Sequence, residues 1–104
     1  MEVSEQRVIR RKILLALYRV YQEHPHTMLS PREVMEVAEV TYDELLRSIF
    51  YLEEHGFVEC LKGFGTPLFG AARLTAYGVD LVENQQRLNE LFPVADEKTV
   101  APPD

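Results

Sequence analysis

Apolar side chains recur at helical spacing through the first part of the chain. Between Ser4 and about Glu23 they occupy positions 8, 9, 13, 17, 20 and 21, which share one face of a helix. Proline disfavours helical backbone at the residue before it, so the sequence His24-Pro25-His26 ends the segment. The pattern predicts a first helix from Ser4, which can act as its N-cap, to about Glu23.

A second helix has a strong start signal in the sequence Ser30-Pro31-Arg32-Glu33. Ser30 is the predicted N-cap, Pro31 suits the first helical position, and Glu33 stands three residues after the cap as in a capping box. The helix is predicted to end near Glu39, and a short turn follows at Val40. Because another helical pattern begins at once, the two segments predict a helix-turn-helix.

The third helical pattern is bounded by a cap residue and a glycine. Thr41 can accept a hydrogen bond from an N–H of the first turn, and two acidic residues follow where the helix dipole favours negative charge. One apolar stripe holds Leu45, Ile49 and Leu52. Gly56 suits a left-handed C-cap. The segment predicts a helix of roughly four turns from Thr41, a stop at Gly56 and a strand from Phe57.

Residues 57–74 have the composition of a β-hairpin. The predicted strands are residues 57–62 and 67–74, and the tip between them contains Gly63 and Gly65, which tolerate the positive φ of a tight turn. Pro67 has no N–H, so it is expected at the start or the edge of its strand.

The pattern after the hairpin is helical again. Thr75 is the predicted N-cap of a helix that stays apolar over a wide arc to about Phe92. From Pro93 the chain is polar and rich in proline, which predicts disorder. The expected organisation is one domain over residues 1–92 and a disordered tail over residues 93–104.

Two junctions in this order of elements resemble those of winged helix-turn-helix proteins. The sequence Leu52-Glu53-Glu54-His55-Gly56-Phe57-Val58 is similar to their L-E-x-x-G-[LF]-[IV] junction between recognition helix and wing. The sequence Leu74-Thr75-Ala76-Tyr77-Gly78 is similar to the L-T-x-x-G entry to the last helix in the MarR and PadR families. The resemblance covers about residues 4–92. It implies an α+β, mostly helical fold with three helices, a two-stranded wing hairpin and a long C-terminal helix.

This resemblance implies a small DNA-binding transcriptional regulator. The outward face of the third helix would enter the major groove of double-stranded DNA, and the wing would contact the neighbouring backbone or minor groove. Arg47 suits a guanine edge, and Lys62 and Arg73 suit phosphates. The candidate DNA-binding residues are Arg32, Tyr42, Arg47, Ser48, Tyr51, Lys62, Phe64 and Arg73. Phe64, at the hairpin tip, is either a probe for a partner or a ring folded back on the hairpin.

The charge distribution opposes a nucleic-acid partner. The formal net charge of the chain is −6, with +3 on residues 1–22, −7 on residues 23–60 and −2 on residues 61–104. The acidic block contains the expected recognition helix, and phosphates repel acidic surfaces. A second function therefore stays open, in which the same scaffold is a protein–protein interaction module for a basic partner.

A basic cluster stands apart from this acidic block. It consists of Arg7, Arg10, Arg11 and Lys12. The cluster is either a phosphate-contacting patch or a solvated helix face.

No residue pattern indicates catalysis, a cofactor or a metal site. Cys60, His55 and Asp43 are the types of residue in a nucleophilic triad, but an inward-facing cysteine on a strand is more often a small core residue. His24 and His26 lack a nearby cysteine that would complete a metal site. The single cysteine and the interrupted apolar runs fit a cytoplasmic protein without a membrane span.

The first and last helices have wider apolar arcs than one small domain should bury. Winged-helix regulators commonly pair through such helices, so a homodimer is expected. The candidate dimerisation residues are Tyr18, Tyr21, Leu88, Leu91 and Phe92. The alternative is that the two helices pack on each other within one chain.

Overall fold

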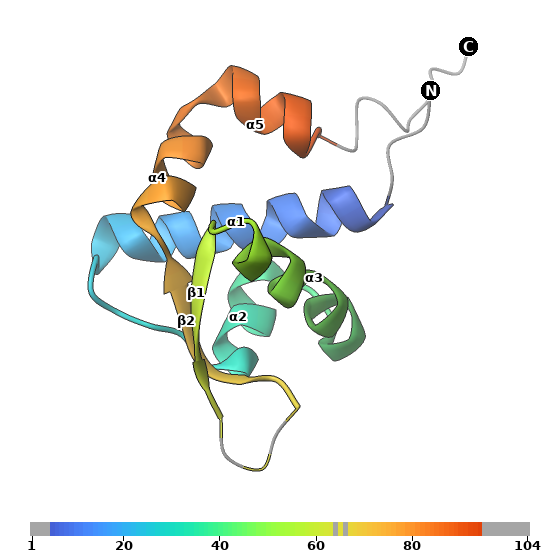
Figure 1. Cartoon of the computed structure of the whole chain (residues 1–104), viewed down its shortest axis with the longest axis vertical. Coiled ribbons are helices and arrows are strands. Elements are labelled where there is room, and N and C mark those ends of the chain that lie inside the picture. The colour runs from blue at the N-terminus through green and yellow to red at the C-terminus, as the bar shows by residue number, and fades with distance from the viewer. Residues whose placement is uncertain (1–4, 64, 66, 95–104) are drawn as a thin grey trace.

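The computed structural model describes residues 5–63, 65 and 67–94. Its elements are α1 (Glu5–Glu23), α2 (Pro31–Ala38), α3 (Tyr42–Glu54), β1 (Val58–Lys62), β2 (Phe69–Leu74), α4 (Ala76–Glu83) and α5 (Gln85–Leu91) (Figure 1). This α+β, mostly helical arrangement is a winged helix-turn-helix, as the sequence predicted.

Helix α1 is the centre of the packing. It contacts α2, α3, β2 and α4. Figure 1 shows it crossing the molecule, with α2 and α3 on one side and α4 and α5 on the other. Ile13 and Leu14 of α1 are fully buried, in the same apolar core as Leu45 and Leu52 of α3. Each such side chain contributes roughly 2 kcal/mol by leaving water.

Reciprocal capping boxes fix the starts of α2 and α3. The Ser30 N–H donates to Glu33 Oε1 at 2.8 Å, and the Glu33 N–H donates to Ser30 Oγ at 3.2 Å. Thr41 and Glu44 make the equivalent bonds at 2.9 and 3.1 Å. The sequence predicted the first box and the Thr41 cap, but not the reciprocal bond from Glu44. These caps fix the residues at which the two helices of the helix-turn-helix begin.

The two strands form an antiparallel hairpin whose register places Val58 opposite Leu74. Both strands are shorter than the sequence predicted: β1 begins at Val58, and β2 begins at Phe69, so Pro67 lies before it. Leu29 makes an additional bridge, because its N–H and C=O each bond to the backbone of Ala72 at 2.8 Å. A single bridging residue has no periodic pattern, which is why the sequence did not reveal this contact.

The C-terminal region departs from the prediction of one long helix. Asn84 has φ −102° and ψ 91°, which ends α4. Its side chain then caps α5 by accepting a bond from the Arg87 N–H at 3.1 Å. Asparagine competes with helical backbone in this way, so Asn84 was the available signal. Of the predicted disordered tail, residues 95–104 lie outside the described residues.

The α3–β1 junction is tied directly to the start of α4. Gly56 adopts φ +83°, in agreement with its predicted role as a helix stop. The Thr75 hydroxyl donates to the Gly56 carbonyl and accepts from the Gly78 N–H at 3.0 Å. The Thr75 N–H donates to the Phe57 carbonyl at 3.1 Å. The two sequence motifs that resembled winged-helix proteins are therefore in contact with each other.

Candidate nucleic-acid interface

The outward face of α3 is exposed but not basic. Arg47 Nε donates to Asp43 Oδ2 at 2.9 Å, one helical turn away, and the two side chains are 61% and 69% exposed. Exposed pairs of this kind contribute at most about 1 kcal/mol, so an incoming phosphate or guanine can displace Asp43. DNA would therefore compete with the Asp43 carboxylate for the Arg47 guanidinium group.

Ser48 does not belong to this face. Its side chain is 1% exposed, and it lies on the buried stripe with Leu45, Ile49 and Leu52. The prediction that Ser48 reaches a base or phosphate is therefore wrong. The small hydroxyl is accommodated where α3 packs against the rest of the domain.

Tyr51 is turned toward α1 rather than toward solvent. The guanidinium carbon of Arg10 lies 3.6 Å from the centroid of the Tyr51 ring, a cation–π contact. His55 lies on the same ring, with 4.6 Å between centroids. Tyr51 is half-buried in this arrangement, so its ring serves the packing of α1 against α3.

The wing holds one paired and one unpaired cation among the described residues. Arg73 Nη2 forms a 2.6 Å ion pair with Glu59 Oε1, directly opposite on β1. Lys62 is exposed and forms no ion pair with any other described residue. Phe64, the third wing candidate, lies outside the described residues.

The remaining two candidates lie near the N-termini of neighbouring helices. Arg32 is exposed in the first turn of α2, and Tyr42 is 46% exposed at the start of α3. Helix N-termini favour bound anions, which is the position expected for phosphate contacts in a helix-turn-helix. Arg32, Tyr42, Arg47 and Lys62 are thus the predicted residues with side chains open to a ligand.

The basic cluster of α1 is neither a free phosphate-contacting patch nor a fully solvated helix face. Arg7 Nη1 donates to the Leu91 carbonyl at 2.8 Å, and Arg11 Nη1 donates to the Phe92 carbonyl at 2.7 Å. These carbonyls are at the C-terminal end of α5, where the helix dipole favours cations. With Arg10 on Tyr51, three of the four cations serve internal contacts.

The candidate dimerisation residues divide into two groups. Leu88 is 0% exposed and Phe92 is 3% exposed within the single chain. Both are core residues, so the prediction that they form a dimer interface is wrong. Tyr21 is 36% exposed, and Tyr18 and Leu91 are partly buried. The Tyr18 hydroxyl donates to Glu83 Oε2 at 2.8 Å, which raises the pKa of Tyr18.

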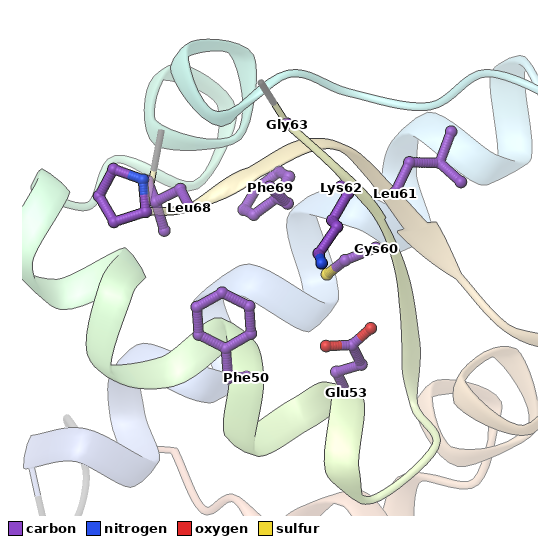
Figure 2. Close-up of a pocket in the computed structure, with 9 residues that line it drawn as sticks. Phe50, Glu53, Cys60, Leu61, Lys62, Gly63, Leu68 and Phe69 are labelled. Carbon is purple, nitrogen blue, oxygen red and sulfur yellow. The ribbon is translucent and has the colours of Figure 1, made fainter. Parts of the chain in front are cut away.

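A pocket of about 340 Å³ between α3 and the hairpin has no counterpart among the sequence predictions. Its lining residues are Phe50, Glu53, Cys60, Leu61, Lys62, Gly63, Pro67, Leu68 and Phe69. Figure 2 shows Phe50 and Glu53 extending from α3, and Cys60 and Lys62 extending from β1. No single segment carries this set, which is why the sequence pattern did not reveal it.

The residues that suggested a nucleophile or a metal site can be located in the structure. The pKa of the Cys60 thiol is raised to about 12, first by burial and then by the charges of Glu53 and Glu59, so the thiol is a poor nucleophile. Within residues 5–63, 65 and 67–94, no three His, Cys, Asp or Glu side chains gather as a metal site. No helix in those ranges combines the length and the apolar character needed to cross a bilayer.

Comparison with known proteins supports the fold. The structure resembles the crystal structure of a putative DNA-binding protein from Ralstonia eutropha JMP134, with a TM-score of 0.66 and 22% sequence identity. The match covers 74% of this chain and 93% of the Ralstonia chain. No family model matches the sequence, and no curated protein matches it. The likeness extends over nearly all of the Ralstonia domain and establishes a shared fold.

Proposed function

We propose that the protein is a small DNA-binding transcriptional regulator of the MarR/PadR-like kind, without catalytic activity. The observation that carries this proposal is the open face of the helix-turn-helix: Arg47, Arg32 and Tyr42 are all exposed on α2 and α3. The fold that this chain shares with the putative DNA-binding protein from Ralstonia supports the same proposal.

In this proposal α3 enters the major groove and the hairpin lies along the backbone. Arg47 leaves Asp43 and binds a base edge, while Arg32 and Lys62 bind phosphates. A homodimer would bind two half-sites about one helical turn apart, because the symmetry of the operator follows that of the protein.

The test is a mobility shift of random-sequence duplex at low salt. Non-specific affinity of such domains is typically about 1–100 μM, so a shift in that range of protein concentration is expected. Absence of a shift at about 100 μM protein and low salt would contradict the proposal, because low salt favours even weak phosphate contacts.

Two variants separate base contacts from backbone contacts. Arg47→Ala should weaken binding and relax the preference at one base position, whereas Arg32→Ala should weaken binding evenly across sequences. An even loss across all sequences from Arg47→Ala would exclude the base-contacting role.

A second candidate function is a protein–protein interaction module. Two observations favour it: Arg47 and Arg73 are paired with acidic residues, and the pocket between α3 and the hairpin is lined partly by apolar side chains. A basic protein partner would meet the acidic α3 without electrostatic opposition. The same mobility shift discriminates, because this module would leave the duplex unshifted.

A further inference from the structure

The pocket between α3 and the hairpin has the size of a small-molecule site. Its volume of about 340 Å³ is at the lower end of the range for ligand pockets, roughly 300–1,000 Å³. Leu68 and Phe69 are buried in its wall, and Phe50 is 38% exposed at its side. Leu61 lines the pocket, but Figure 2 shows its side chain pointing away. Apolar and aromatic groups therefore provide part of the inner surface, beside Glu53 and Lys62.

Two opposite charges face the pocket without pairing. Glu53 comes from α3 and Lys62 from β1, and neither side chain makes an ion pair or hydrogen bond with any residue of the described ranges. Lys62 is exposed, and its long stem lets the ammonium group reach water. Glu53 is only partly exposed and has a short stem. The carboxylate is therefore the charge that gains most from a partner.

Two carboxylates contribute negative potential at Cys60, in the wall of the pocket. The pKa of the neighbouring Cys60 thiol is raised by burial and further raised by Glu53 and Glu59. Of these two carboxylates, only Glu53 lines the pocket, because Glu59 lies outside the lining and is paired with Arg73. An anionic ligand would therefore meet Glu53. A cation would be attracted by Glu53, and its apolar body would contact the Phe50 and Phe69 side chains that line the same pocket.

We propose that this pocket binds a small organic cation with an apolar body. The ammonium group would lie at Glu53, and the apolar body would lie against Phe50, Leu68 and Phe69. Binding at this pocket requires no DNA, so this proposal can be tested independently of the proposed function.

The experiment uses three probes that share one body and differ in charge. 3-Phenylpropylamine is the cation, 3-phenylpropan-1-ol is neutral and 3-phenylpropionate is the anion. Each is titrated into the full-length ¹⁵N-labelled chain, and amide shifts of residues in α3 and β1 report binding. The cation is expected to bind with a Kd of roughly 1 mM, about fivefold more tightly than the alcohol. The anion should bind most weakly.

Matched variants test the role of the carboxylate. Glu53→Gln keeps the shape of the side chain and should remove the about fivefold preference for the cation. Glu54→Gln makes the same charge change at the next residue, which is exposed and does not line the pocket, so the preference should persist. Phe50→Ala should weaken all three probes by a similar factor, because it removes part of the common apolar wall.

Three outcomes would overturn the proposal. The first is absence of amide shifts at about 10 mM cation, roughly ten times the expected Kd. The second is tightest binding by the anion, which would make Lys62 the recognising group. The third is an equal affinity for the cation and the alcohol, which would mean that the Glu53 carboxylate takes no part in recognition.

Discussion

Three arginines that face possible ligands already have partners within the chain. Arg47 pairs with Asp43, Arg73 pairs with Glu59, and Arg10 lies on the Tyr51 ring. The first two pairs are well exposed and therefore weak. At the residue scale, DNA affinity depends on how easily Arg47 exchanges its carboxylate for a phosphate or a base.

Asp43→Asn should strengthen binding to random duplex roughly threefold to tenfold at low salt, because it frees Arg47 and removes one charge that repels phosphate. Fluorescence anisotropy at several salt concentrations would measure this gain. Asp80→Asn on α4 makes the same charge change away from α3 and should have a smaller effect. Equal gains from the two variants would mean that only net charge matters and that the Asp43–Arg47 pair has no special role.

Cys60 should be almost inert toward alkylation while the protein is folded. Its pKa of about 12 against an ordinary value of 9.0 leaves roughly a thousandfold less thiolate at pH 8 than in the unfolded chain. Because the folded pKa is raised, the reaction rate should increase with pH throughout the range below about 12. Iodoacetamide labelling followed by mass spectrometry, native against denatured, measures the ratio. Native and denatured rates within about tenfold of each other would show that the thiol is not shielded.

At the scale of the elements, the contact between the two junction motifs explains why they occur together in the sequence. Thr75 caps α4 and also donates to Gly56, so one side chain joins the end of α3 to the start of α4. A Cβ on Gly78 would lie only 2.1 Å from the Phe57 carbonyl oxygen. The second motif therefore requires glycine so that α4 can approach the strand that follows α3.

Gly78→Ala should destabilise the domain by about 1–3 kcal/mol, since the added methyl group forces α4 away from Phe57. Urea unfolding followed by circular dichroism measures the change. The control is Asp80→Ala, an exposed position in the same helix, which should alter stability by less than about 0.5 kcal/mol. A stable Gly78→Ala protein would mean that the approach of α4 to Phe57 is looser than the structure indicates.

Element starts and stops were predictable from sequence where a local side chain determines them. Ser30 and Thr41 each cap the helix that begins at the next residue. Gly56 ends α3 because glycine readily adopts positive φ. The Arg47–Asp43 pair is equally local, because residues four apart share a helix face. The Leu29 bridge and the pocket depend on segments distant in sequence. Local patterns do not specify how such segments approach each other.

At the scale of the whole molecule, basic residues near the N-terminus hold the C-terminal helix in place. Arg7 and Arg11 donate to carbonyls at the end of α5. The sequence showed that positive charge was concentrated in residues 1–22, but the same cations could equally have faced solvent. Their use in packing leaves a net acidic surface elsewhere, so a DNA complex should depend on few phosphate contacts and its affinity should fall only gently as salt is raised.

The proposed homodimer can be tested through the terminal-helix residues that reach the surface. Tyr21→Ser combined with Leu91→Ser should raise the dimer dissociation constant about tenfold or more, because buried aromatic and aliphatic side chains dominate such interfaces. Sedimentation velocity over a range of protein concentrations measures it. Tyr42→Ser removes an exposed tyrosine from α3 and should leave the dimer intact. A wild-type chain that remains monomeric would contradict the dimer. Dissociation by Tyr42→Ser would place α3 inside the interface, and a helix covered by a second subunit could not enter a DNA groove.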